Sequence, residues 1–93
     1  MSPNEIDKIL KLVDDGLQRT ELGRKFDLRS ERDVTREDDI WLYVAVAPHR
    51  AGVRAYEFAE LLATIEQEVR TQAHKQEILL VPVRIEGTTN GTH

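Results

Sequence analysis

Residues 40–47 read Ile-Trp-Leu-Tyr-Val-Ala-Val-Ala, the longest unbroken apolar run of the chain and the site of its only tryptophan. The polar residues 36–39 precede this run, and Pro48 follows it. A strand with one wet face would alternate between apolar and polar residues, which this run does not do. Its length, its β-branched and aromatic residues and the breakers around it predict a strand that is buried on both faces.

Two other stretches have the periodicity of a helix. Residues 2–5, Ser-Pro-Asn-Glu, have the pattern of a capping box with proline at the first helical position. They predict a helix over residues 3–15, ended by Gly16 in the left-handed conformation. A longer helix is expected after Pro48, ending near residue 74. The apolar stripes of the two helices are Ile6, Ile9, Leu10, Val13 and Leu17 in the first, and Phe58, Leu62, Ile65 and Val69 in the second.

Two further strands are expected to flank the apolar run. Residues 24–34 alternate between a drier face and a charged face, which is typical of an edge strand. A polar turn over residues 35–39 would then connect this strand to the apolar run as an antiparallel hairpin. Residues 77–86 contain a second apolar strand, which should lie parallel to the first because a helix connects the two. Proline lacks a backbone donor, so Pro82 places this strand at an edge of the sheet.

These elements predict an α+β fold, a two-layer α-β-β-α-β sandwich. Its three-stranded mixed sheet would have the Trp41 strand in the centre and two helices packed against it. Residues 1–86 would form a single domain. Residues 87–93 contain no apolar residue, and we expect them to be a disordered C-terminal tail.

The number of layers leads to a hypothesis about assembly. If both helices cover the same face of the sheet, the other face leaves Trp41, Tyr43 or their opposite neighbours uncovered. An uncovered apolar face on so small a domain indicates a partner, most simply a second copy related by a two-fold axis. Trp41 and Tyr43 are therefore candidate residues of a dimer interface. The alternative is a monomer with one helix on each face.

Composition limits the classes of function. The 93 residues carry a net charge of −4, with 40% hydrophobic and 32% charged residues. An acidic balance disfavours a general nucleic-acid binder. There is no cysteine, no apolar signal region at the start and no run long enough for a membrane span, so we expect a soluble cytoplasmic protein that requires no cofactor.

No motif of a known catalytic or metal site occurs in the chain, so no catalytic residue and no metal ligand is assigned. A small non-enzymatic interaction or accessory protein, homodimeric or bound to another protein, is the leading interpretation. An enzyme that uses His49 with an acid of residues 37–39 is disfavoured, since these groups lie at opposite ends of one strand, roughly 26 Å apart. A small enzyme with a site assembled at a dimer interface stays open as an alternative.

The other alternative is a binder of anions, nucleotides or RNA that uses the loop of residues 48–54. This loop would leave the carboxyl end of a strand and enter a helix N-terminus, where free amide donors favour negative charge. Gly52 would allow a close backbone approach, and His49, Arg50 and Arg54 would supply cationic side chains. These four residues are the candidate anion site, and a small anion is its expected ligand.

Overall fold

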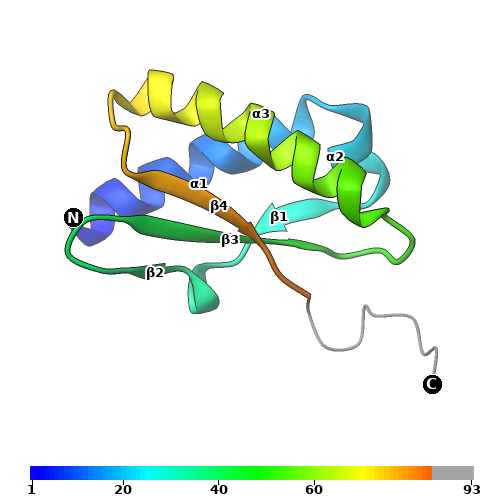
Figure 1. The fold of residues 1–93 in the computed structure, drawn as a ribbon, viewed down its shortest axis with the longest axis horizontal. Coiled ribbons are helices and arrows are strands. Elements are labelled where there is room, and N and C mark those ends of the chain that lie inside the picture. Colours follow the sequence, from blue (N-terminus) through cyan, green and yellow to red (C-terminus); the bar gives the residue numbers. More distant parts are fainter. Residues whose placement is uncertain (85–93) are drawn as a thin grey trace.

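A computed structural model describes residues 1–84 of the 93-residue chain. The predicted α+β class and two-layer arrangement are confirmed (Figure 1). In chain order the elements are α1 (Pro3–Gln18), α2 (Glu21–Lys25), β1 (Leu28–Ser30), the 3-10 helix η1 (Arg32–Val34), β2 (Arg36–Glu37), β3 (Leu42–Pro48), α3 (Ala55–Ala73) and β4 (Ile78–Pro82).

The start of α1 is confirmed and its end was predicted wrongly. The Ser2 hydroxyl accepts the Glu5 backbone N–H at 3.2 Å, and the Glu5 carboxylate accepts the Ser2 N–H at 3.0 Å, which completes the capping box. The helix then continues through Gly16 because Leu17, fully buried, extends the apolar stripe by another turn. A Cβ at Gly16 would lie 3.3 Å from the Ile65 side chain of α3. Gly16 therefore lets α1 and α3 approach closely, and it does not end α1.

The charged strand predicted over residues 24–34 is much shorter in the structure. The Thr20 hydroxyl caps α2, which takes the first two residues of that stretch, and Asp27 follows with a positive φ of 51°. Only β1 then forms a ladder before η1 interrupts the edge, and β2 forms where a turn was expected. The Thr35 hydroxyl accepts the N–H of Ala45 at 3.2 Å, replacing the missing backbone partner at this break.

β3 is the central strand, as predicted. β4 pairs with it in parallel from Leu42 to Val46, so the antiparallel β1 and β2 must share its other side. The sheet is mixed, and it has four strands where three were predicted, because two short strands take the place of one long partner of β3. β3 begins at Leu42 rather than residue 40, because Asp38 Oδ1 accepts the N–H groups of Ile40 and Trp41 at 2.8 and 2.6 Å and holds them in a turn.

The second helix is confirmed, and the last strand forms but ends at Pro82, within the predicted residues 77–86. α3 ends at Ala73, His74 caps it in the left-handed conformation, and its predicted stripe is buried. β4 lies at the edge with Pro82 as its last residue, as expected from the missing donor.

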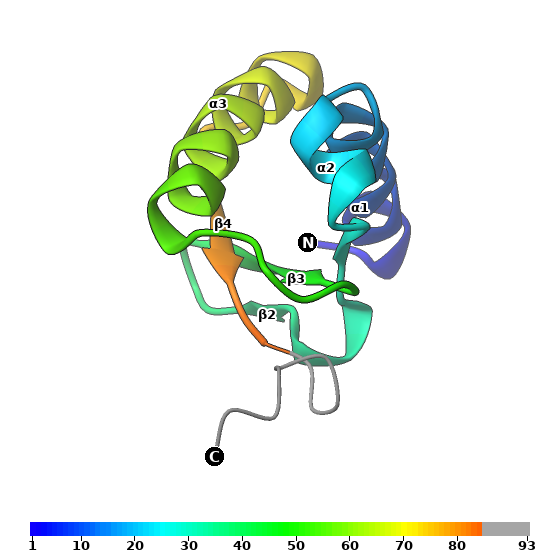
Figure 2. The ribbon, with the colours of Figure 1, turned by 90° about the vertical axis from the view of Figure 1, so that its right-hand side faces the viewer.

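α1 and α3 lie side by side on one face of the sheet, as the end-on view shows (Figure 2). Their apolar stripes pack on the sheet side chains that point toward them and form the core. The fully or nearly fully buried members of this core include Val13, Leu17, Leu28, Leu42, Val44, Val46, Ile65, Val69 and Ile78.

The predicted C-terminal tail, residues 87–93, lies outside the described residues, as do the last two residues of the predicted domain. Within residues 1–84, no helix combines the length and the apolar character that crossing a bilayer requires.

Candidate interaction surface

No helix of residues 1–84 covers the second face of the sheet, and this face carries a small apolar surface. Side chains alternate between the two faces of a strand, so β3 and β4 each send every second residue away from α1 and α3. Tyr43, Leu79 and Val81 are half-buried there, whereas Ala45 and Ala47 on the same side of β3 are only 2% and 0% exposed. We call these five residues the open face.

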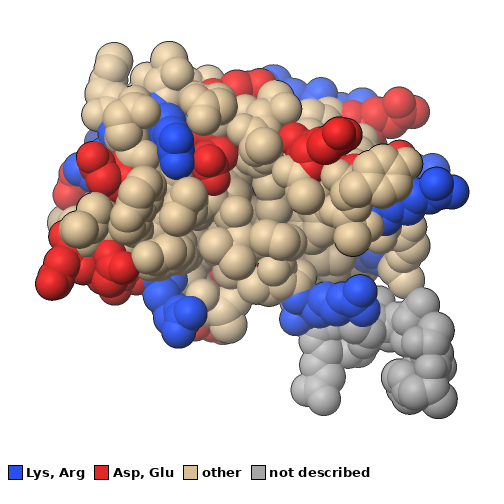
Figure 3. Space-filling model, viewed as in Figure 1, with Lys and Arg blue, Asp and Glu red and all other residues tan. Residues whose placement is uncertain are grey.

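Two arginines border the open face along β1 and β2. Arg29 pairs with Ala47 across the strands and Arg36 with Tyr43, so both arginines belong to the uncovered side. In the view of Figure 3, Lys or Arg side chains project at the lower margin of the molecule, and Asp or Glu side chains lie at its lower left. Arg29 holds Asp27 through contacts of 2.6 and 2.9 Å, and these hydrogen bonds lower the pKa of the Asp27 carboxyl.

The β4 edge of the sheet is closed by two side chains of α3. The outward N–H of Leu80 donates to Glu66 Oε1 at 2.9 Å, and Arg70 Nε donates to the outward carbonyl of Ile78 at 3.0 Å. Arg70 and Glu66 also form an ion pair at 3.2 Å, with side chains only 16% and 17% exposed. A strand from another chain would have to break this arrangement to pair with β4.

The β1 edge is closed in the same way by the other helix. Asp14 of α1 accepts the outward N–H of Ser30 at 2.7 Å and the Ser30 hydroxyl at 3.1 Å. Each helix therefore supplies one carboxylate that satisfies an edge donor. Sequence reasoning missed both acids, because neither lies in a motif or on an apolar stripe. The spacing of Glu66 and Arg70, four residues apart, was the one available signal.

The two candidate interface residues lie in different places. Tyr43 is on the open face, and its hydroxyl donates to Asp38 Oδ2 at 2.8 Å, which raises the pKa of Tyr43. Trp41 precedes β3 and is half-buried, with the Arg70 guanidinium 6.0 Å from its ring centre. Only Tyr43 therefore belongs to the uncovered surface, while Trp41 lies beside the closed β4 edge.

The loop of residues 48–54 folds back on the chain's own carboxylates. Gly52 makes the expected turn with a φ of 108°. His49 Nε2 lies 2.7 Å from Glu31 Oε2. The pKa of Asp27 is lowered first by its hydrogen bonds with Arg29 and to a smaller extent by the nearby Arg50. Arg54 is the N-cap of α3 and gives no side-chain cap. The anion site stays a prediction, and two carboxylates already compensate part of its positive charge.

The acidic residues 37–39 do not assemble a catalytic or metal site with the histidine of that loop. Glu37 pairs with Leu42 at one end of β3, and His49 follows the other end. Among residues 1–84, no three His, Asp or Glu side chains are placed to hold a metal ion together.

Comparisons with known proteins found no match for this chain among family models, curated proteins or solved structures. The surface of the described chain therefore carries the functional information: a sheet face that no helix of residues 1–84 covers, lying between the β1 and β4 edges whose outward N–H groups are bonded to helix carboxylates.

Proposed function

We propose that this protein is a non-enzymatic interaction domain of the cytoplasm that forms a homodimer through the open face. The observation that carries the proposal is the contrast between the open face and the two edges. An apolar surface on a small domain indicates an interface. Because Asp14 and Glu66 occupy the edge donors, association by strand addition is disfavoured and association through the face remains.

The pattern of large and small side chains supports a second copy as the partner. β3 and β4 are parallel, and Ala45 lies beside Val81 in their register, as Tyr43 lies beside Leu79. A two-fold axis running along the strands between β3 and β4 would place Val81 of each copy over Ala45 of the other. Tyr43 would then meet Leu79 of the other copy. This geometry keeps the strands of the two sheets nearly aligned, as packed sheets usually are.

Sedimentation tests the proposal directly. We expect the wild-type chain to have twice its monomer mass of 10.7 kDa at about 50 µM. Val81→Arg should be monomeric at the same concentration, because a buried guanidinium without a partner is costly at an apolar interface. Gln67→Arg makes the same change in charge on the exposed surface of α3 and should remain dimeric.

Two results would overturn the dimer. One is a wild-type chain that stays monomeric up to about 500 µM, far above the concentrations at which specific dimers form. The other is a Val81→Arg variant that dimerises as well as Gln67→Arg does. Circular dichroism of both variants would establish that they fold, so a monomeric result reports the interface and not unfolding.

A further inference from the structure

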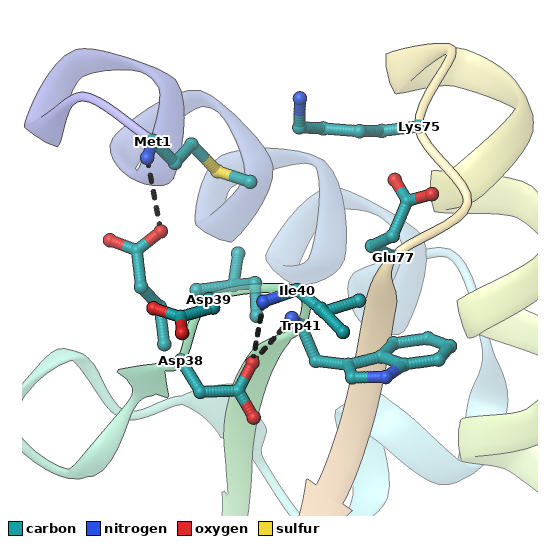
Figure 4. A pocket seen from close by; sticks show the side chains of 9 residues that line it. Met1, Asp38, Asp39, Ile40, Trp41, Lys75 and Glu77 are labelled. Atoms are coloured by element: carbon teal, nitrogen blue, oxygen red, sulfur yellow. Dashed lines mark hydrogen bonds and ion pairs between the residues drawn. The ribbon is translucent and has the colours of Figure 1, made fainter.

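A second surface lies at the end of the sheet where β3 and β4 begin, away from the open face. A pocket there is lined on its apolar side by Met1, Ile40 and Trp41 and on its charged side by Asp39, Lys75 and Glu77, among others. Figure 4 shows Ile40 at the base of the pocket, with Met1 on one side and Lys75 and Glu77 on the other. We call it the Ile40 pocket.

The apolar side chain at the base is exposed on a turn that is held in place. Ile40 is 67% exposed, which is more than any other exposed large apolar residue of residues 1–84. Asp38 fixes the backbone on both sides of it, since Oδ1 accepts the N–H groups of Ile40 and Trp41 and Oδ2 accepts the Tyr43 hydroxyl. The exposure of Ile40 is therefore part of the fold, which presents an apolar group to solvent in a defined position.

The charge around the pocket is predominantly negative. The cationic groups that line it are Lys75 and the amino group of Met1. Four carboxylates also line it, those of Glu37, Asp38, Asp39 and Glu77. The Met1 amine is paired with Glu37 at 3.1 Å, and Asp38 is committed to its turn. Asp39 and Glu77 form no side-chain hydrogen bond or ion pair with any other residue of the described part of the chain. These two carboxylates are available to a cation from outside.

The aromatic ring beside the pocket already accepts a guanidinium. Arg70 lies 6.0 Å from the centre of the Trp41 ring, within the range of a cation–π contact. The ring also lines the pocket, so a second cation that enters there meets both a π surface and carboxylates. Arginine is suited to such a place because its planar group stacks on aromatic rings and pairs with carboxylates through two parallel hydrogen bonds.

From these observations we infer that the Ile40 pocket binds a linear segment of a partner protein in which arginine alternates with aliphatic residues. The aliphatic side chain packs on Ile40 and Met1. The arginines before and after it reach Asp39 and Glu77, which lie on opposite sides of Ile40, Glu77 on the side of Trp41 (Figure 4). The inference does not depend on the homodimer, because the pocket and the open face share none of their residues.

The probe for this inference is the peptide acetyl-Arg-Leu-Arg-Leu-amide, with acetyl-Glu-Leu-Glu-Leu-amide as its acidic counterpart. Trp41 is the only tryptophan, so its fluorescence reports the pocket without a label. We expect saturable binding of the basic peptide with a Kd of about 1 mM or below, and no binding of the acidic peptide. The Ile40 methyl resonances should shift with the same Kd, which locates the peptide at the base of the pocket.

Matched variants distinguish binding at the Ile40 pocket from attraction of the peptide to the net negative charge of the chain. Asp39→Asn/Glu77→Gln should bind the basic peptide about fivefold more weakly, since two solvent-exposed ion pairs are lost. Glu21→Gln/Glu60→Gln removes two exposed carboxylates elsewhere and should bind it as the wild type does. Ile40→Ser, at an exposed position, should also weaken binding without unfolding the chain.

The inference fails if neither the Trp41 fluorescence nor the Ile40 methyl signals change at about 10 mM basic peptide, well above the affinity expected. It also fails if the two double variants lose affinity equally, which would show attraction to net charge alone. A dimer that persists in Asp39→Asn/Glu77→Gln would confirm that this pocket is tested separately from the open face.

Discussion

The two faces of the sheet differ although the same strands build them. Along β4, Ile78 and Leu80 are buried under the helices, while Leu79 and Val81 are only half-buried on the opposite side. The amino-acid sequence does not distinguish the two sets, because all four residues are aliphatic. A continuous apolar strand is typical of a sheet covered on both faces. Within residues 1–84 no helix covers Leu79 and Val81, and the proposed second copy would cover them.

The sharpest test of this comparison is a pair of neighbouring substitutions. Ile78→Ala should lower the free energy of unfolding by about 3 kcal/mol, because a fully buried side chain leaves a cavity. Leu79→Ala, one residue later on the open face, should cost less than about 1 kcal/mol in the monomer. Urea unfolding followed by circular dichroism would measure both.

The concentration of protein must be chosen with care in this test, because a dimer adds its own stability to the folded state. At about 1 µM the losses in unfolding free energy should differ as stated, because the chain is monomeric. At higher concentration the loss caused by Leu79→Ala should grow, because this variant also weakens the dimer. Equal losses for the two variants at low concentration would mean that both faces are closed within one chain, and the comparison would break.

The edges provide a second comparison, with a smaller effect. Glu66→Ala leaves the Leu80 N–H without its acceptor and Arg70 without its ion pair, so we expect a loss of about 1–2 kcal/mol in unfolding free energy. Asp14→Ala should act similarly through Ser30 at the opposite edge. Hydrogen exchange of the Leu80 and Ser30 amides would show which edge each variant opens.

The matched control for the edges is Glu60→Ala, which removes an exposed carboxylate from the same helix as Glu66. It should change the unfolding free energy by less than about 0.5 kcal/mol and leave both amides protected. If Glu66→Ala behaves like this control, then water replaces the carboxylate at no cost. The β4 edge would then be open to strand addition, contrary to our account of the closed edges.

The regular apolar patterns of the elements were predictable from the sequence. The hydrogen bonds in which a side chain replaces a backbone partner were not. The stripe of α3 and the missing donor of Pro82 each follow from one element alone, and both are confirmed. The interruption of the charged strand depends on the hydroxyls of Thr20 and Thr35, which replace backbone partners only once distant segments meet.

The candidate surfaces were predictable only in part, for the same reason. The apolar content of the Trp41 strand indicated an uncovered face, and Tyr43 does lie on it. Trp41 lies outside β3 because its backbone N–H donates to Asp38 Oδ1 and not to a neighbouring strand. Nothing in the spacing of Asp38, an acid within an acidic run, distinguishes this role from that of a solvated turn residue.

The smallest expected effect concerns Asp38 itself, whose turn holds Tyr43 on the open face and Ile40 in its pocket. The N–H groups of Trp41 and Ile40, followed by the Tyr43 hydroxyl, donate to the ionised carboxylate and lower its pKa below the usual 3.8. The stabilisation by this group is therefore complete above the unfolded pKa. It is lost as the pH falls through the lower, folded pKa.

Tyr43→Phe removes one of these three donors and tests whether the open face and the turn are connected. The pKa of Asp38 should rise toward 3.8 but remain below it, because the two backbone donors are retained. A carboxyl NMR titration between about pH 2 and pH 6, spanning the usual aspartate range, would follow the change. In the wild-type chain the pKa of Tyr43 is raised by the same bond, so both groups of the pair can be titrated. An unchanged Asp38 pKa in Tyr43→Phe would mean that the tyrosine ring is not held by the turn. The largest side chain of the open face would then be free to leave it, and the difference between the two faces would rest on Leu79 and Val81 alone.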